Sequence, residues 1–390
     1  MRRFANKMFE AFRRGDLVLL LLCVVTTVFG CLIIASATNV HASGSTRFIL
    51  VQAGAACAGI FAYVFFSSVD TEVFSEHRIA MVIFNTVLLL LLVPFGTDLS
   101  TGNKSWLNFP FLPFDIQPAE VCKITFVLVM ASVMASRQNN ISSPLSIGHI
   151  LLNMMLVVGL NLLVSRDMGV SLIFVFITVG MVWAGGVSIL WFITAFAGLA
   201  LAAPLAWEFV LSDNQKNRIL VLFDPSLDPN GTGPLYHTIR ALRSLTGGGL
   251  TGQGLFQGNR TQTRGALFAQ HTDFIFAAIG EELGFIGCGL VLLLLIAIIA
   301  RCIWVGNRST DYLRKMVCFG TASALIFQVV VNVGMCIGVM PVIGLTLPFI
   351  SYGGSSIITL YAMLGLVSGV YARPHATSHE RYIRPPLIHY

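Results

Sequence analysis

The sequence predicts an all-α protein that crosses a membrane about ten times, with both termini in the cytoplasm and one large extracytoplasmic loop. Three observations predict this fold class. Of the 390 residues, 56% are hydrophobic and only 11% are charged, whereas a soluble protein carries roughly a quarter charged residues. The apolar residues gather in runs of about 20, the length that crosses the hydrocarbon core of a bilayer. Lys and Arg lie mostly on one side of these runs.

Ten runs are long and apolar enough to be membrane-spanning helices. They cover about residues 17–38, 46–67, 77–96, 118–137, 146–164, 168–185, 187–210, 273–300, 315–340 and 349–372. The chain shows no internal repeat, which disfavours the transporter folds that are built from inverted repeats. We therefore expect one membrane domain over residues 1–390, with the extracytoplasmic loop at residues 211–272 inside it.

The basic residues beside the spans predict the orientation. With the N-terminus inside, the cytoplasmic segments carry 14 Lys and Arg, whereas the short outer segments carry only Arg47, Lys104 and Arg166. The net charge of +6 is thereby explained by membrane flanks, and nucleic acid is not an expected partner. The eight Cys are scattered without metal-ligand spacing, which is typical of small hydrophobic side chains.

The predicted loop is rich in Gly, as in "TGGGLTGQG". Glycines would let the backbone approach a bulky ligand, and the alternative is a flexible loop. Within the loop, Leu235, Ile239 and Leu242 recur at helical spacing. This stripe predicts a short helix on the outer membrane surface, with an ordinary solvated loop as the alternative.

Ionisable residues gather at the outer ends of the predicted spans. Glu120 and Lys123 are three residues apart on one helix face and can pair, either near a ligand or as a structural brace. Asp167 lies in a tight outer turn, where the alternative is a helix cap. A transporter needs polar groups along a path through the midplane. Here the polar groups lie only at the depth of the lipid headgroups, which favours an enzyme that acts on a lipid-anchored substrate.

The stretch "AQHTDFIFAAIGEELGF" places Asp273 at the start of the eighth span and Glu281 and Glu282 inside it. On one helix, Asp273 and Glu281 are about 12 Å apart along the axis, too far for the paired carboxylates of glycoside hydrolysis, which are about 5–9.5 Å apart. Glu281 would also lie two turns deeper in the membrane. We therefore expect Asp273 to act alone and the glutamates to be structural; the alternative for Asp273 is a helix N-cap.

Six stretches together resemble the SEDS family (shape, elongation, division and sporulation proteins), which includes RodA, FtsW and SpoVE. They occur in the family's order along nearly the whole chain. The matching stretches are "IQPAEVCK" (116–123), "SRDMG" (165–169), "NRILVLFDPSLDPNGTG" (217–233), "SLTGGGLTGQGL" (244–255), "HTDFIFAAIGEELGFIG" (271–287) and "GLTLPFISYGGSS" (344–356).

The resemblance implies a peptidoglycan glycosyltransferase of the bacterial cytoplasmic membrane, which polymerises lipid II on the outer face for elongation, division or sporulation. It implies a class B penicillin-binding protein as partner, and no organic cofactor. The family's essential aspartate matches Asp273, which would act as the general base. Arg218, Lys123 or a divalent cation, Mg²⁺ or Mn²⁺, would neutralise the leaving pyrophosphate. The expected substrate contacts are Gln117, Glu120, Lys123, Asp167, Arg218, His271 and Ser351.

Three positions depart from the family pattern. Ala119 replaces a Ser, the stretch before His271 lacks the usual Leu-Pro-Glu, and Ile343 stands where FtsW usually has a Lys. The last departure, together with "GLFQGNRTQ" (254–262), favours the RodA and SpoVE branch. Two other functions remain open: a transporter that flips lipid II, and a non-catalytic scaffold for a transpeptidase.

Overall fold

The computed structural model describes residues 13–39, 44–98, 104–110, 114–209, 212–228, 233 and 235–373. Among them, nine helices are long and apolar enough to cross a membrane, and α9 is a shorter apolar helix. Eight of the long helices are α2 (Leu17–Ala37), α3 (Gly44–Ser68), α7 (Pro118–Ser136), α8 (Pro144–Val164), α10 (Ile189–Phe209), α13 (Ile275–Arg308), α14 (Tyr312–Cys336) and α15 (Gly354–Ala372), and the shorter helix α9 is Met168–Ala184. The predicted third span is α5 (Arg78–Leu90) continued by α6 (Leu92–Phe95). The predicted number of about ten apolar helices is confirmed.

Short elements connect these helices. They are α4 (Thr71–Glu76), the hairpin of β1 (Gly96–Asp98) and β2 (Lys104–Leu107), and η1 (Gln138–Asn140). In the predicted extracytoplasmic loop the elements are α11 (Asp213–Phe223), η2 (Pro225–Leu227) and α12 (Tyr236–Gly248). The sequence pattern predicted α12 but not α11. The buried side of α12 carries small residues such as Ala241 and Ser244 rather than the predicted stripe, and Leu242 is exposed.

Two hydrophobic cores meet inside the bundle. One is centred on α2, α3, α13 and α15 and the other on α5, α7, α8 and α9, and α14 contributes buried side chains to both. The segment between α14 and α15 passes along the boundary between the two cores, because Leu345 packs in the second core and Leu347 in the first. Small residues allow close helix packing within the first core: a Cβ on Gly365 of α15 would lie 2.5 Å from the Tyr63 carbonyl oxygen on α3.

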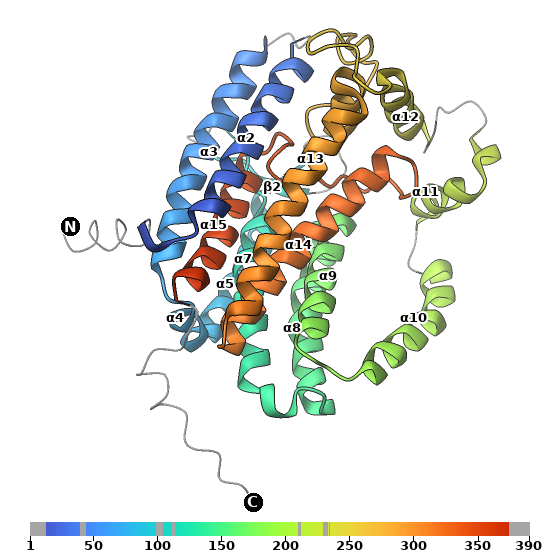
Figure 1. Cartoon of the computed structure of the whole chain (residues 1–390). Coiled ribbons are helices and arrows are strands. Elements are labelled where there is room, and N and C mark those ends of the chain that lie inside the picture. Colours follow the sequence, from blue (N-terminus) through green and yellow to red (C-terminus); the bar gives the residue numbers. More distant parts are fainter. Residues whose placement is uncertain are drawn as a thin grey trace, which may run out of the picture.

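The two ends of the bundle differ. At one end, which we call the terminal end, Asp16 at the start of α2 contacts Arg301, and Tyr371 at the end of α15 stacks on Trp304. The opposite end, which we call the loop end, carries residues 249–272 (Figure 1). An even number of spans predicts that both ends of the described chain lie together, as they do.

The eighth span was predicted as one continuous helix, and this prediction is wrong. Gly284 has φ of +66° and interrupts α13. The Cys288 Sγ atom lies 3.9 Å from the Phe276 carbonyl oxygen, although residues 12 apart in a straight helix are about 18 Å apart. The chain therefore reverses at Gly284. A short arm, residues 275–283, runs toward the loop end, and the long arm, residues 285–308, crosses the bundle.

This reversal corrects the predicted depth of the acids. Asp273 is held beside Asn332 of α14, whereas Glu281 contacts Arg260 and Thr261 of the loop. Glu281 is thus nearer the loop end than Asp273, and not two turns deeper. A glycine was needed at the reversal because a positive φ strains other residues.

We expect Gly284→Ala to destabilise the protein by about 1–3 kcal/mol, the cost of a forced backbone conformation. The added Cβ would also lie 2.4 Å from the Gly252 nitrogen. Gly289→Ala is the matched control, because Gly289 is helical and its Cβ would meet nothing within 4 Å. Thermal unfolding in detergent measures both variants. Equal midpoints would show that the Gly284 backbone is not constrained.

Helix α10 stands apart from the bundle (Figure 1). It is attached near its first turn, where Trp191 Nε1 donates to the Ser142 carbonyl oxygen at 2.8 Å. None of its membrane-spanning window is buried. Its exposed side chains are almost all apolar, such as Phe196 and Leu201, so lipid can surround it.

Candidate functional site

The structure places Asp273 in the turn before α13, at the seam of the two cores. The N-cap of α13 is Phe274, and no side chain caps it. The capping alternative for Asp273 is therefore not supported. Asn332 Nδ2 donates to the Asp273 carbonyl oxygen at 2.8 Å and to the Leu345 carbonyl oxygen at 2.7 Å. The backbone is thus fixed while the carboxylate has no capping role.

The Asp273 side chain is half-buried beside a tight turn. Gly344, with φ of +73°, brings this turn so close that a Cβ there would lie 3.6 Å from Asp273 Oδ2. Burial, and to a smaller degree the charge of Asp167, raises the pKa of the Asp273 carboxyl to about 6. A carboxylate with such a pKa is ionised at neutral pH and is a stronger base than an ordinary aspartate.

Asp167 is the nearby second carboxylate. Its Oδ1 accepts from the Val170 backbone N–H at 3.1 Å and caps α9, so the predicted alternative role as a cap is present. Its Oδ2 accepts from Gln117 Nε2 at 3.3 Å. Burial raises the pKa of Asp167, and the Glu120 charge adds to the rise. Asp167 and Gln117 thus lie together on the side of the site formed by α7 and α9.

The predicted pair of Glu120 and Lys123 is confirmed. Lys123 Nζ lies 2.8 Å from Glu120 Oε2, and the two residues are 1% and 4% exposed. Thr359 of α15 donates to Glu120 Oε2 at 3.1 Å. Glu120 thereby joins α7 to α15, and Lys123, with its ammonium paired and buried, is not positioned to bind a pyrophosphate directly.

Hydrogen bonds connect the backbone at residues 271–272 to the backbone at residues 351–352 beside the site. Ser351 Oγ donates to the Thr272 carbonyl oxygen at 2.6 Å and accepts from the Leu347 N–H at 2.8 Å. The Tyr352 N–H donates to the His271 carbonyl oxygen at 2.8 Å. These contacts support a positioning role for Ser351, whose hydroxyl was expected to contact substrate.

Arg218 approaches the same turn from α11. Its Nη1 donates to the Val342 carbonyl oxygen at 3.0 Å, and its side chain is exposed. Val342 is two residues from Gly344, so this guanidinium lies at the rim of the Asp273 site. Of Arg218 and Lys123, the two side chains expected to neutralise the pyrophosphate, only Arg218 is exposed.

Sequence reasoning missed Asn332 and Gln328. They lie one turn apart on α14, are 0% and 2% exposed, and each has an amide oxygen without a hydrogen-bond partner in the described part of the chain. Polar residues inside a span are costly and usually functional. Two amides at helical spacing in an otherwise apolar run were the signal that could have identified them.

Glu281 and Glu282 are structural, as predicted, but they hold the loop. Glu281 accepts from the backbone N–H groups of Arg260 and Thr261, both at 2.9 Å. Glu282 Oε1 accepts from Gln262 Nε2 of the loop at 3.0 Å and from Ser36 Oγ of α2 at 2.7 Å. The two carboxylates fasten the loop to the short arm of α13.

The Gly-rich run also has a structural use. A Cβ on Gly248 would lie 1.8 Å from the Gly280 carbonyl oxygen, and one on Gly252 would lie 2.1 Å from the Glu282 carbonyl oxygen. These glycines let the loop backbone pack directly on the short arm of α13. The predicted approach to a bulky ligand is not needed to explain them.

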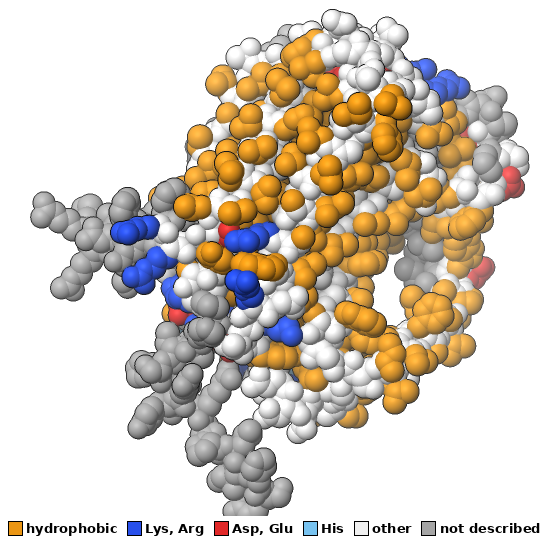
Figure 2. Space-filling model, viewed as in Figure 1, with side chains coloured by type: hydrophobic (Ala, Val, Ile, Leu, Met, Phe, Trp, Pro, Cys, Tyr) orange, Lys and Arg blue, Asp and Glu red, His pale blue; other side chains and the backbone are white. Residues whose placement is uncertain are grey.

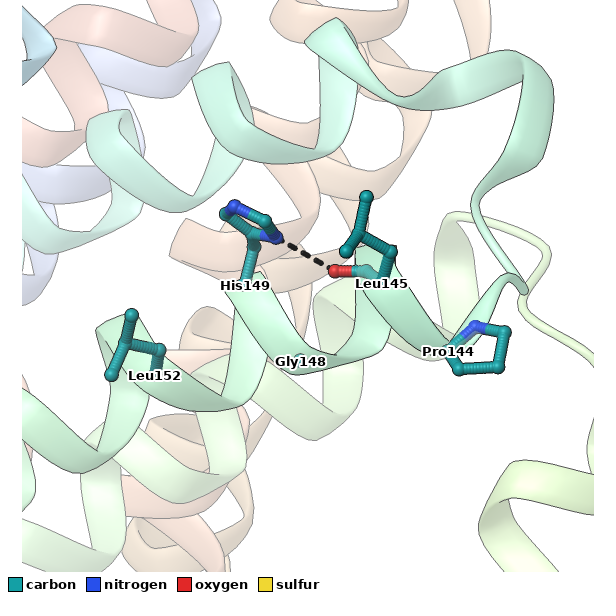
Figure 3. A pocket seen from close by; sticks show the side chains of 5 residues that line it. All are labelled: Pro144, Leu145, Gly148, His149 and Leu152. Carbon is teal, nitrogen blue, oxygen red and sulfur yellow. Dashed lines mark hydrogen bonds between the residues drawn. The ribbon is translucent and has the colours of Figure 1, made fainter.

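A groove of about 400 Å³ lies elsewhere, on α8, and is lined by Pro144, Leu145, Gly148, His149 and Leu152 (Figure 3). His149 Nδ1 lies 2.7 Å from the Leu145 carbonyl oxygen of the preceding turn. All five lining residues belong to α8 and none belongs to the Asp273 site, so this open groove is not the candidate site. Within the described residues, no group of three or more His, Cys, Asp and Glu could hold a metal ion.

Comparisons with known proteins cover nearly the whole chain. Residues 16–375 match the family model FtsW/RodA/SpoVE, described as "Cell cycle protein". The peptidoglycan glycosyltransferase MrdB of Escherichia coli K12 is 31% identical over 360 residues, which are 91% of this chain and 93% of MrdB. A probable peptidoglycan glycosyltransferase FtsW of Geobacter metallireducens is 31% identical over 377 residues, covering 94% and 97% of the two chains. The sequence identities to MrdB and to FtsW are equal, so they do not show which of these two branches the chain belongs to.

A solved structure shares the fold. It is a chain in the structure of a peptidoglycan synthase complex that coordinates polymerization and crosslinking. It superposes with a TM-score of 0.76 at 28% identity, over 95% of this chain and 99% of that chain.

Proposed function

The chain belongs to the FtsW/RodA/SpoVE family of cell cycle proteins, and on this premise we propose that it is a peptidoglycan glycosyltransferase that polymerises lipid II. The observation that carries the proposal is the Asp273 carboxylate. It is half-buried, its backbone is fixed by Asn332, its pKa is raised to about 6, and it caps no helix. Such a group suits proton abstraction better than a structural role.

In the proposed reaction, a sugar hydroxyl of the acceptor attacks the anomeric carbon of the donor. Asp273 takes the hydroxyl proton as the new glycosidic bond forms. The bond from the anomeric carbon to the lipid pyrophosphate breaks, and the pyrophosphate leaves with the electron pair. Arg218, exposed at the rim, would neutralise part of that charge. Holding both substrates in the membrane supplies proximity.

A divalent cation remains part of the proposal. Mg²⁺ is commonly bound by one or two carboxylates together with substrate phosphates. Asp167, whose carboxylate lies close enough to Asp273 to influence its pKa, is the residue that would share such an ion with the pyrophosphate. Bound there, the ion would supply charge neutralisation for the leaving group.

We also propose a crosslinking enzyme, a class B penicillin-binding protein, as partner, and the bacterial cytoplasmic membrane as the location. The structural neighbour from a complex that coordinates polymerization and crosslinking supports the first. The apolar helices make the chain a multi-pass membrane protein. The family supports the cytoplasmic membrane.

The proposal is tested with purified full-length protein in detergent and lipid II, with and without Mg²⁺ or Mn²⁺. Glycan strands on a gel would support it. If lipid II stays intact under every condition, also in the presence of a cognate penicillin-binding protein, the proposed function is wrong.

The rate should depend on pH through Asp273. A base with a pKa of about 6 is protonated and inactive below that pH, so kcat should rise through pH 6 and level off above it. Asp167→Asn should move this rise to lower pH, because it removes a charge that raises the Asp273 pKa. Asp224→Asn is the control, since Asp224 is an exposed loop residue whose Oδ1 accepts from the Ser226 backbone N–H. Profiles that coincide for all three proteins would exclude coupling between Asp167 and Asp273.

The loop end should face outward. In a Cys-less background, a Cys at exposed Thr263 should react with a membrane-impermeant maleimide in spheroplasts, and a Cys at exposed Asn307 should not. The charge bias of the flanks is the reason. Labelling of the Asn307 variant alone would place Asp273 in the cytoplasm.

A further inference from the structure

An aromatic and basic cluster lies at the terminal end of α13, opposite the Asp273 site. The Trp304 ring is flanked by two guanidinium groups, with Arg301 Cζ 4.1 Å and Arg308 Cζ 4.0 Å from its centroid. Tyr371 of α15 stacks on Trp304 at 6.2 Å between ring centroids. Cation–π contacts hold the two arginines in defined positions.

The two arginines differ in their charge balance. Arg301 Nε donates to Asp16 Oδ2 at 2.8 Å and its Nη2 donates to Oδ1 at 3.1 Å, which neutralises it. Arg308 is exposed and takes part in none of the salt bridges of the described residues. The Arg308 guanidinium therefore combines a fixed position with unused donors, a combination suited to a phosphate.

More positive charge surrounds the cluster. Arg13 and Arg14 are exposed and lie three and two residues before Asp16, the buried partner of Arg301. Figure 2 shows Lys and Arg side chains gathered on this face beside the lower part of α13, with hydrophobic side chains between and above them. Asp16 is 1% exposed, so it presents almost no negative surface there.

Apolar surface continues from the cluster into the membrane region. Leu17, Val18 and Leu21 follow Asp16 on α2 and are 49%, 54% and 63% exposed. A molecule held at Arg308 by its phosphate could lay acyl chains on these side chains. Arg301 and Arg308 are seven residues apart, or about 10 Å along the helix. The cluster thus covers the depth of a headgroup and its glycerol.

We propose that this cluster, formed by Arg301, Trp304, Arg308 and Tyr371, is a binding site for the headgroup of an anionic phospholipid in the leaflet at the terminal end. The phosphate would accept hydrogen bonds from Arg308. A zwitterionic headgroup would bring its own cation to a surface with excess positive charge and bind more weakly. Basic clusters beside spans recognise anionic lipids in this way. The site is separate from the proposed chemistry at Asp273.

The test uses the purified full-length protein in a neutral detergent and native mass spectrometry. Dioleoyl phosphatidylglycerol is titrated against dioleoyl phosphatidylcholine, which has the same acyl chains. Arg308→Gln should lower the affinity for phosphatidylglycerol about fivefold, as expected for one basic residue near a lipid phosphate. Arg78→Gln is the matched control, because Arg78 is another exposed arginine at the terminal end, outside the cluster.

A second variant, Trp304→Leu, keeps the charge and removes the ring that holds Arg308, and it should also weaken binding. The proposal is overturned if wild type does not prefer phosphatidylglycerol, or if the Arg78 variant loses as much affinity as the Arg308 variant. Competition by glycerol 3-phosphate at the same concentration as the lipid would also overturn it, since the site would then bind free phosphate and not a lipid.

Discussion

Asp273→Asn is expected to abolish polymerisation while the protein keeps its fold. The amide has nearly the shape of the carboxylate but cannot take the acceptor's proton, and a positioned general base contributes about 10²- to 10⁴-fold to a rate. The backbone contact to Asn332 uses the Asp273 carbonyl oxygen and is unchanged by the substitution. Glycan synthesis from lipid II, measured at matched protein concentration, gives the rate.

The control must separate chemistry from binding and folding. The Asn variant should keep the thermal unfolding midpoint of the wild type and its affinity for lipid II. Asp224→Asn, in the exposed part of the loop, should polymerise normally. A well-folded Asp273→Asn protein with a near-normal rate would rule out the proposed base.

Removing one member of the buried pair should cost more stability than removing both. Lys123→Met leaves the Glu120 charge buried with only Thr359 as a partner, and Glu120→Gln leaves the Lys123 ammonium uncompensated. Breaking a buried pair on one side costs about 3–5 kcal/mol, whereas an apolar or neutral replacement of both is often tolerated. Thermal unfolding of the two single variants and the double variant measures the cycle.

The expected pattern is a double variant more stable than either single variant. Activity should follow stability in this series, since neither side chain is exposed. Strictly additive losses would mean that the pair does not behave as a unit.

The positions of the helices could be predicted from the sequence because the hydrocarbon core imposes a length and an apolar composition on each span. The pairing of Glu120 with Lys123 was also predictable, since residues three apart on a helix are neighbours on one face and opposite charges there can pair. Both features depend only on local spacing.

The course of the chain around Asp273 could not be predicted in the same way. An apolar run shows that a helix can form but not that the chain reverses inside it, and Gly284 is one of several glycines in that run. The reversal became visible only through contacts between residues far apart, such as Glu281 with Thr261. The prediction from one continuous helix therefore placed Glu281 deeper than Asp273, which is the reverse of their order in the structure.

The roles of the residues around Asp273 could not be predicted from the sequence either. Asp273 could be identified by its motif, but the roles of its neighbours depend on which backbone atoms they reach. Ser351 holds the Thr272 carbonyl oxygen and Asn332 holds that of Asp273. Neither contact follows from spacing, because Asn332 and Ser351 are more than 50 residues from Asp273 in the chain.

The most direct measurement is a reconstitution that records polymerisation and lipid II crossing together. Proteoliposomes with fluorescent lipid II are prepared with the wild type and with Asp273→Asn, and glycan strands and headgroup translocation are followed in the same vesicles. The proposed function predicts strands with the wild type, none with the variant, and no difference in translocation between the two. Translocation by the wild type without any glycan strands would contradict it and show a lipid II transporter.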